Sequence, residues 1–270
     1  MIELEVAKEL AIQAGEILLD SFGKVHEVTI TEEGPTTWVD KASSDLIVSR
    51  LRERFPDDGI LSEELEDDRE RLRKRRVWCI DPLDSTRQYI TGTSDFSVIL
   101  SLAEKGTPIM GLLYRPAERK FYFAVKSEGA FSQVVGQDPV RIRVSRTDFS
   151  AKRLLILISD SRGEKAIKEL EAKVPKAWPI KMSGSVKTCI VAKGEADAFL
   201  LTRENLMRDW DLCGPQVILE EAGGRLTDLE GRTIEYNQKY TRQYGLLASN
   251  GVLHNQLLVQ MRGRAIEAGA

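Results

Sequence analysis

Two aspartates, Asp81 and Asp84, lie three residues apart where a short apolar segment, Val77 to Ile80, meets a turn. Because the residue before a proline is biased towards extended conformations, Pro82 predicts a short strand that breaks at this point. Two carboxylates held about 4 Å apart repel each other by roughly 4 kcal/mol at an effective dielectric constant of about 20. A divalent cation removes that repulsion, so the spacing predicts a metal site at this turn.

A second feature follows directly in the chain. Asp84, Ser85 and Thr86 are residue types that begin helices, and the backbone amides at a helix start are free to bind an anion. The turn therefore predicts a phosphate site beside the metal site.

Further carboxylates stand where other strands end or helices begin, positions from which loops commonly present functional groups. Taken singly, each is ordinary: Asp40, for example, is equally well explained as a helix-start acid favoured by the helix dipole. Taken together, they would offer hard oxygen ligands to two or more Mg²⁺ ions. The candidate ligands are Glu63, Asp81, Asp84, Asp211 and the backbone carbonyl of Leu83.

The composition narrows the chemistry further. The formal net charge of −3 over 270 residues argues against binding to a nucleic-acid polymer or to an anionic membrane. Two histidines, His26 and His254, and three scattered cysteines disfavour histidine-based zinc chemistry, a Ser-His-Asp triad and a disulfide framework. Any metal is therefore expected to be bound by oxygen, which points to Mg²⁺, Mn²⁺ or Ca²⁺.

The spacing of apolar residues predicts the elements that must position these groups. Residues 2–22 and 39–54 show the three- and four-residue steps of amphipathic helices. Residues 95–133 instead contain strand-like runs separated by turn residues, which is typical of an antiparallel meander. From about residue 150, expected strands and helices alternate along the chain.

This change divides the chain into two expected halves. An α+β half, residues 1–147, carries the meander and most of the metal ligands, and an α/β half, residues 148–270, carries Asp211 and the residues on the substrate side. Acidic residues within the N-terminal apolar pattern argue against a signal peptide, and no apolar run is long enough to span a bilayer. A cytoplasmic location is therefore expected.

Three motifs carry a resemblance to a known family. They are Leu61-Ser62-Glu63-Glu64, Trp78-x-x-Asp81-Pro82-Leu83-Asp84-x-Thr86, and Trp210-Asp211 followed by Glu221-Ala222-Gly223-Gly224. In this order and over nearly the whole chain, they resemble the inositol monophosphatase superfamily of Mg²⁺-dependent, lithium-sensitive phosphatases. The resemblance implies a layered αβαβα sandwich of the sugar-phosphatase type with the site between its halves. It also implies two or three Mg²⁺ ions, for which Mn²⁺ could substitute, and inhibition by Li⁺.

Within the superfamily, the chain is most similar to the 3′(2′),5′-bisphosphate nucleotidases of bacterial type. The segments that carry this likeness include residues 61–64, 81–90, 96–98, 111–116 and 187–194. Two departures stand out: the family most often has glycine where this chain has Ser85, and smaller residues ahead of Asp40. The first bears on phosphate affinity and substrate choice, and the second on the role of Asp40.

The resemblance implies roles for the site residues. Glu63, Asp81 and the Leu83 carbonyl would bind the first metal ion. Asp84 and Asp211 would bind the second, with Asp81 bridging the two ions. Thr86, paired with Asp40, would orient or deprotonate the attacking water, and the backbone amides of Ser85 and Thr86 would receive the phosphate.

Other residues are implied on the substrate side. Gly184 and Ser185 would flank the leaving group, and Asp211 would contact the substrate as well as the metal. Glu204, seven residues before Asp211, would accept a sugar hydroxyl, with an ordinary surface acid as the alternative. Lys187 would either contact the second phosphate of a bisphosphate or face solvent.

The expected activity is Mg²⁺-dependent hydrolysis of 3′-phosphoadenosine 5′-phosphate to AMP and phosphate by a metal-activated water. One alternative is a phosphatase for inositol 1-phosphate or for a broad range of sugar phosphates. An alternative of another class is a metal-dependent protein that binds a phosphate ligand without turnover. The expected partner is a small phosphate ester, and a homodimer is a candidate assembly because dimers are common in families of this kind.

Overall fold

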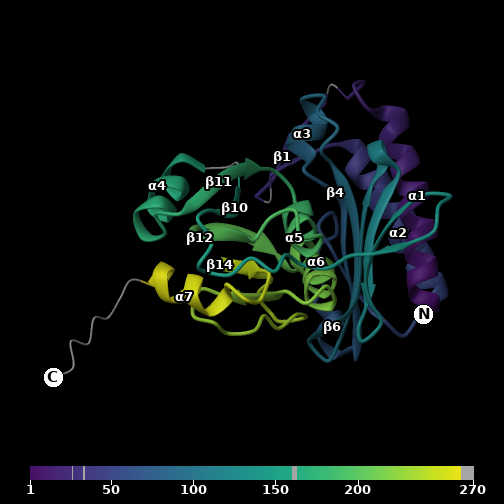
Figure 1. Ribbon diagram of the computed structural model, residues 1–270. Coiled ribbons are helices and arrows are strands. Elements are labelled where there is room, and N and C mark those ends of the chain that lie inside the picture. Colours follow the sequence, from purple (N-terminus) through teal and green to yellow (C-terminus); the bar gives the residue numbers. More distant parts are fainter. Residues whose placement is uncertain (26, 33, 160–162, 263–270) are drawn as a thin grey trace.

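The computed structural model describes residues 1–25, 27–32, 34–159 and 163–262. These residues form five layers in the order helix, sheet, helix, sheet, helix (Figure 1). The αβαβα sandwich predicted from the sequence is therefore confirmed. Within the described residues, no helix combines the length and the apolar character needed to cross a bilayer.

The larger sheet contains seven strands in the order β3-β4-β5-β6-β7-β8-β9. Their bounds are Gly59–Ser62, Arg76–Asp84, Ser97–Glu104, Thr107–Arg115, Lys120–Val125, Gly129–Val134 and Val140–Arg141. β3 runs parallel to β4, and each later pair of neighbours is antiparallel. The meander predicted between residues 95 and 133 is confirmed.

β4 departs from the sequence prediction in a way that matters for the site. The strand does not break at Pro82 but continues to Asp84, with a register shift after Asp81. Asp81 pairs with Ile99 and Asp84 with Ser97, so β4 contains one residue more than β5 over this interval, which is a β-bulge. In a regular strand, residues three apart face opposite sides of the sheet, whereas the extra residue brings both aspartates to the same side.

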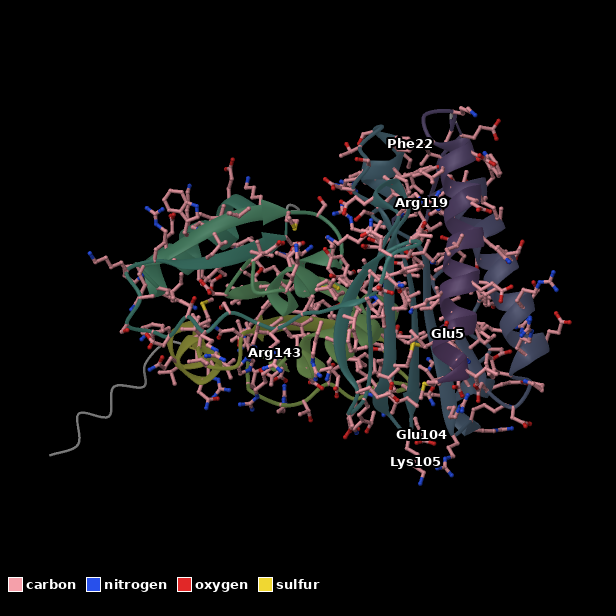
Figure 2. All side chains as sticks on the ribbon, turned by 45° about the vertical axis from the view of Figure 1, so that its right-hand side comes forward. Glu5, Phe22, Glu104, Lys105, Arg119 and Arg143 are labelled. Carbon is pink, nitrogen blue, oxygen red and sulfur yellow. The ribbon has the colours of Figure 1, made fainter. Side chains whose placement is uncertain are left out.

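Two long helices cover the outer face of this sheet. α1 (Ile2–Ser21) and α2 (Trp38–Arg54) pack against each other and against β4, β5 and β6. Figure 2 shows both helices along one side of the sheet, with Glu5 and Phe22 near opposite ends of α1. The aliphatic and aromatic residues between the helices and the sheet form one buried cluster.

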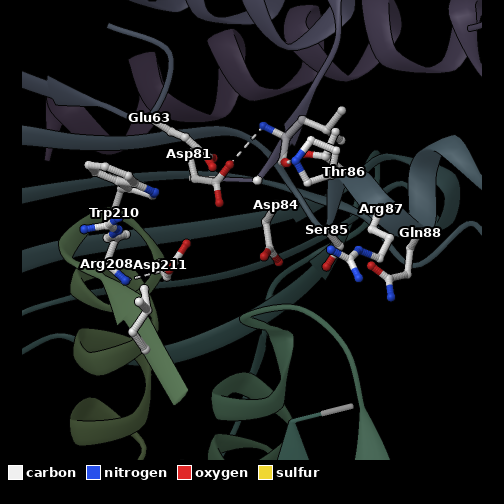
Figure 3. A pocket seen from close by; sticks show the side chains of 14 residues that line it. Glu63, Asp81, Asp84, Ser85, Thr86, Arg87, Gln88, Arg208, Trp210 and Asp211 are labelled. Atoms are coloured by element: carbon white, nitrogen blue, oxygen red, sulfur yellow. Dashed lines mark hydrogen bonds between the residues drawn. The ribbon is translucent and has the colours of Figure 1, made fainter. Parts of the chain in front are cut away.

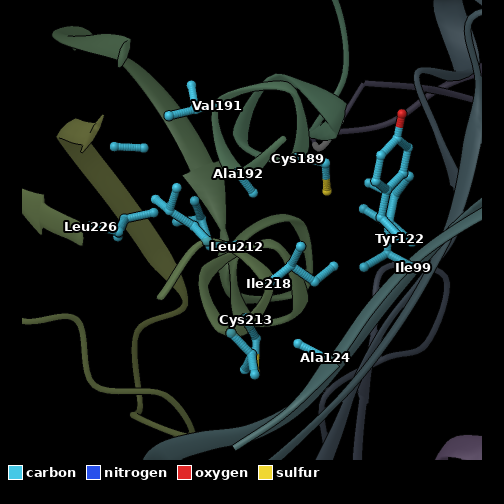
Figure 4. Packing of buried hydrophobic residues seen from close by; sticks show 14 of the residues in the cluster. Ile99, Tyr122, Ala124, Cys189, Val191, Ala192, Leu212, Cys213, Ile218 and Leu226 are labelled. Atoms are coloured by element: carbon cyan, nitrogen blue, oxygen red, sulfur yellow. The ribbon is translucent and has the colours of Figure 1, made fainter. Parts of the chain in front are cut away.

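The middle layer contains α5 (Val186–Ala192) and α6 (Asp209–Glu221). Their apolar residues form a core with the inner faces of both sheets, part of which is drawn in Figure 4. α6 lies directly on β6, because a Cβ atom added to Gly111 would lie 2.2 Å from the Gly214 carbonyl oxygen. α6 also contacts β4, and its first turn carries Asp211.

The smaller sheet has the order β11-β10-β12-β14-β13. The strands are β10 Leu154–Ser159, β11 Ala177–Met182, β12 Ala198–Arg208, β13 Arg225–Asp228 and β14 Arg242–Ser249. Its outer face is covered by α4 (Gly163–Lys173) and α7 (His254–Arg262) around a third apolar cluster. The division into halves at residue 147 remains a prediction, since α6 and its core join the two sheets.

Short elements complete the fold. They are the hairpin of β1 (Thr29–Ile30) and β2 (Pro35–Thr36), the helix α3 (Thr86–Ile90), and the 3₁₀ turns η1 (Glu70–Arg73) and η2 (Pro116–Glu118).

Candidate metal-dependent active site

Three aspartates meet at the junction between the larger sheet and α6. Carboxylate oxygens of Asp81, Asp84 and Asp211 all lie within 4.8 Å of one another. Figure 3 shows their side chains converging on the cavity, with Glu63 beside Asp81. The convergence that the sequence predicted for these residues is therefore present, although they come from elements more than 120 positions apart in the chain.

Local structure explains each position. The bulge aims Asp81 and Asp84 at the same side of β4, and Asp211 lies in the first turn of α6, where its Oδ2 accepts the Arg208 backbone N–H at 2.7 Å. Glu63 follows β3, and its backbone N–H donates to the Ile80 carbonyl at 3.2 Å, which holds it alongside β4. Two neighbouring parallel strands and one helix start thus deliver four acids to one place.

The electrostatics of the cluster favour a bound cation. Burial, and then the charge of Asp211, raise the pKa of Glu63 well above its ordinary value. Burial also raises the pKa of Asp81, with further contributions from Glu63 and Asp84, and burial is the main cause of the raised pKa of Asp84. Burial, and then the charge of Asp84, raise the pKa of Asp211 to about 7. In the absence of a positive ion, burial and mutual repulsion favour the protonated forms of these carboxyls, and a bound cation would favour the ionised forms. Because all of the ligands are oxygen atoms, the set fits a hard divalent cation.

The Leu83 carbonyl lies at the edge of this cluster. The Leu83 backbone N–H donates to Asp81 Oδ1 at 3.0 Å, which fixes the turn between the two aspartates. The carbonyl oxygen of the same residue lies 3.0 Å from Thr86 Oγ1.

Asp40 and Thr86 form a buried pair beside the cluster. Thr86 Oγ1 lies 3.0 Å from Asp40 Oδ1, while Asp40 Oδ2 accepts the backbone N–H of Thr37 at 2.8 Å and its hydroxyl at 2.6 Å. Asp40 is therefore a helix-start acid, within a capping box, and also a partner of Thr86. Burial raises the pKa of Asp40, opposed by the hydrogen bonds from Thr37 and Thr86.

Ser85 adopts the backbone conformation of a glycine. Its φ of 74° and ψ of 42° lie in the left-handed region, which costs a non-glycine residue roughly 1 kcal/mol. Its side chain lies against Gly184, since a Cβ atom added there would be 2.6 Å from Ser85 Oγ and 2.9 Å from Asp84 Oδ2. The serine that departs from the family pattern is thus accommodated because its neighbour across the cleft is glycine.

Ser185 lies nearer to the metal ligands than the sequence suggested. It is buried, and its backbone N–H donates to Asp84 Oδ2 at 2.8 Å while its hydroxyl lies 3.4 Å from Asp84 Oδ1. In this arrangement Ser185 orients Asp84, and Gly184 is the residue of the pair that lines the neighbouring cavity.

Lys187 and Glu204, which were expected on the substrate side, lie in surroundings that the sequence did not predict. Lys187 is only 3% exposed, so it does not face solvent, and its ammonium group donates to the Gly184 carbonyl. Contact with a second phosphate would require it to leave that buried position. Glu204 is exposed on β12, forms an ion pair with Lys165, and is not among the residues that line the cavity.

The cavity itself has a volume of about 240 Å³. Besides the residues already described, its lining includes several for which no catalytic or substrate-binding role was predicted: Gly34, Pro35, Arg87, Gln88, Leu206, Arg208 and Trp210. Arg87 and Gln88 stood inside a recognised motif, but nothing in the sequence alone indicated which way they point. Trp210, interpreted as a packing residue, is largely buried and also contributes to the cavity wall.

The layered fold and the acidic cluster define a metal-dependent phosphomonoesterase. The chain belongs to the inositol monophosphatase family, whose sequence profile matches residues 3–266. Members of this family depend on Mg²⁺. In this chain, the carboxylates described above would be the ligands of that ion.

Named relatives with different substrates are similar to this chain. A 3′(2′),5′-bisphosphate nucleotidase CysQ of Haemophilus influenzae is 29% identical over 242 residues, covering 86% of each chain. A fructose-1,6-bisphosphatase/inositol-1-monophosphatase of Aquifex aeolicus is 32% identical over 265 residues, covering 94% of this chain and 93% of the relative. The solved structure of a Thermotoga maritima IMPase superposes with a TM-score of 0.79 at 28% identity, covering 97% of both chains.

Proposed function

We propose that this phosphomonoesterase hydrolyses 3′-phosphoadenosine 5′-phosphate to AMP and phosphate. The sequence around the metal motif, residues 81–90, and the likeness to a bisphosphate nucleotidase support this substrate. The observation that carries the chemistry is the cluster of Asp81, Asp84 and Asp211, whose oxygens lie within 4.8 Å of one another.

The proposed metal ligands form two overlapping sets. Glu63, Asp81 and the Leu83 carbonyl would hold one Mg²⁺, and Asp81, Asp84 and Asp211 would hold another. When bound there, Mg²⁺ polarises a phosphoryl oxygen, lowers the pKa of a bound water and offsets charge on the leaving oxygen. The backbone N–H of Ser185 keeps Asp84 in the orientation needed for this set.

Thr86 and Asp40 would prepare the attacking water. The Thr86 hydroxyl lies 3.0 Å from both Asp40 Oδ1 and the Leu83 carbonyl, and it can donate its one hydrogen to only one of them at a time. With its hydrogen directed to Asp40, the hydroxyl oxygen can accept a hydrogen bond from water and pass a proton towards the carboxylate. Burial raises the pKa of Asp40, which makes its carboxylate a stronger base than an exposed aspartate.

The phosphate would sit against the start of α3. In this proposal the backbone N–H groups of Ser85 and Thr86 face its oxygens, and Gly184 lies across the cleft from Ser85, where it lines the neighbouring cavity. The mechanism gives Lys187 and Glu204 no direct contact with the reacting phosphate.

A second substrate class has a specific observation in its favour. The relative from Aquifex aeolicus is named as a fructose-1,6-bisphosphatase/inositol-1-monophosphatase, so sugar and inositol phosphates remain the rival substrates. Binding without turnover is set aside because the chain belongs to a family of phosphatases and its three aspartates, Asp81, Asp84 and Asp211, lie close together.

Phosphate release from a panel of esters tests the substrate assignment. The purified chain should release phosphate from 3′-phosphoadenosine 5′-phosphate with a kcat/KM at least tenfold above that for inositol 1-phosphate or fructose 1,6-bisphosphate. Omission of Mg²⁺ should abolish release, and Li⁺ should inhibit it. A clear preference for either of the other esters would overturn the proposed substrate.

A further inference from the structure

A second cavity adjoins the metal site on the side of Ser85. Its volume is about 430 Å³, and it shares Asp84, Ser85, Arg87 and Gln88 with the first cavity. The other described residues of its wall are Ser159 at the end of β10 and Ser183 and Gly184 before α5. The two cavities therefore share a wall, and a ligand anchored at the metal cluster can extend into the second one.

The lining of this second cavity is rich in hydrogen-bond donors. Among the described residues of the wall, Arg87 is the one cationic side chain, Gln88 contributes an amide, and Ser159 and Ser183 contribute hydroxyls. The Gln88 amide donates to Ser183 Oγ at 2.6 Å, which joins α3 to the loop before α5. Asp84 is the only carboxylate among the wall residues that the structure describes, and it belongs to the metal cluster.

Arg87 differs from two other arginines at or near the cleft, Arg115 and Arg208. Arg115 forms ion pairs with Asp95 and Glu118, and Arg208 is buried with its guanidinium 5.9 Å from the centre of the Trp210 ring. The guanidinium of Arg87 is exposed and forms no ion pair or hydrogen bond with any residue in the described part of the chain. Figure 3 shows Arg87 next to Ser85 and Gln88, at the opposite end of the cavity from Asp211.

We propose that Arg87 binds a second phosphate of the substrate, so that the chain selects phosphomonoesters whose organic group carries another phosphate. A guanidinium presents a planar pair of N–H donors that matches two phosphate oxygens, and Gln88, Ser159 and Ser183 stand ready to bind the remaining oxygens or the linking group. The inference rests on the proposed function in one respect: the phosphate that is cleaved must occupy the metal cluster. It adds the residue that distinguishes a bisphosphate from a monophosphate.

The experiment compares substrates that differ only in the second phosphate. The pair 3′-phosphoadenosine 5′-phosphate and 3′-AMP share the same scissile ester, as do fructose 1,6-bisphosphate and fructose 1-phosphate. Wild type should prefer the bisphosphate of at least one pair. Arg87→Gln should reduce kcat/KM for that bisphosphate by about ten- to a hundredfold more than for its monophosphate, chiefly through KM. Arg87→Lys should retain part of the preference, because it keeps the positive charge but loses the planar pair of N–H donors.

Arg52→Gln is the matched control, because Arg52 is exposed on α2 and lines neither cavity. It should preserve the wild-type preference. If wild type prefers a bisphosphate and Arg87→Gln changes both substrates of the pair equally, the second phosphate does not bind at Arg87, while the phosphatase assignment stands. If wild type hydrolyses monophosphates at least as well as bisphosphates, the selectivity itself is refuted. If no ester of the panel is hydrolysed, the proposed function fails, and this inference fails with it.

Discussion

Ser185 donates its backbone N–H to Asp84 Oδ2 at 2.8 Å, although the two residues lie 101 positions apart in the chain. Asp84 belongs to the larger sheet, and Ser185 precedes α5 in the middle layer. The orientation of one proposed metal ligand therefore depends on the packing of a segment that carries no metal ligand itself. The site can form only when the layers are assembled.

The role of Asp84 is tested by Asp84→Asn, which keeps the shape of the side chain and its bond to Ser185 but removes the charge. Because Asp84 would bind the Mg²⁺ ion that the reaction requires, loss of its charge should lower kcat by about a thousandfold or more. In the absence of Mg²⁺ the variant should be more stable than wild type, because one of four repelling carboxylates is neutral.

Phosphate release and thermal unfolding with and without Mg²⁺ measure both effects. Asp45→Asn, which alters an exposed acid on α2, should change neither. Turnover retained in Asp84→Asn would refute the assigned role.

The contact between Ser85 and Gly184 leads to a second prediction. Gly184→Ala places a Cβ 2.6 Å from Ser85 Oγ at a φ of 74°, so we expect a loss of stability of roughly 1–3 kcal/mol and reduced activity. Gly92→Ala is a matched control, because Gly92 has a φ of 76° but nothing within 4 Å of the added atom. Urea unfolding of both variants separates the contact from the backbone strain.

Ser85→Gly, added to Gly184→Ala, should recover part of the lost stability. It removes Oγ and relaxes a left-handed backbone, while the contact with Asp84 Oδ2 at 2.9 Å remains. Equal losses in Gly184→Ala and Gly92→Ala, without recovery in the double variant, would show that the Ser85 side chain does not pack there.

The pair of Thr86 and Asp40 predicts a purely kinetic effect. Thr86→Val removes the hydroxyl that lies 3.0 Å from Asp40 and should lower kcat by about 10²- to 10⁴-fold with little change in Mg²⁺ affinity. Asp40→Asn should act similarly, and the double variant should lose no more than the worse single variant because the two residues act as a unit.

Thr107→Val, at an exposed threonine at the start of β6, should leave kcat unchanged. Thr86→Ser should restore most of the activity, since it returns the hydroxyl. Fully additive losses in the double variant would argue against a relay between the two side chains.

Mg²⁺ affinity should depend on pH through the acidic cluster. Burial and the neighbouring charge of Asp84 raise the pKa of Asp211 to about 7, so this carboxyl is largely protonated below that pH. A metal ion must displace the proton, and affinity should therefore fall as the pH decreases from 8 to 6 and level off above the pKa.

Isothermal titration calorimetry in buffers of different ionisation enthalpy should detect protons released on Mg²⁺ binding at pH 7. Asp211→Asn should bind more weakly and release fewer protons. Binding that is independent of pH, without proton release, would show that these carboxyls are already ionised in the metal-free protein.

Particular residues show how far the sequence could predict this structure. The type and spacing of Asp81, Asp84 and Asp211 pointed to a shared metal site, because few other functions need buried acids at strand ends and helix starts. The β-bulge could not be foreseen, since it depends on how β4 pairs with β5, and Pro82 suggested a strand end instead.

The substrate side was harder to predict for a related reason. Lys187 and Glu204 were assigned by position in a motif, yet burial beneath Gly184 and an ion pair with Lys165 decide where their charged groups lie. Arg87 and Gln88 are candidate binding residues because the structure places both in the walls of two cavities. The types of the metal-site acids were thus predictable, whereas the strand register and the side-chain packing that place individual groups were not.

The central claim is that distant carboxylates converge because a divalent cation binds between them. Crystals soaked in Mn²⁺, an ion that accepts the same oxygen ligands and scatters anomalously, test it directly. We expect at least one anomalous peak within about 2.5 Å of oxygens from Asp81, Asp84 and Asp211, and loss of that peak in Asp84→Asn. A well-ordered cluster without such a peak at millimolar Mn²⁺ would contradict it.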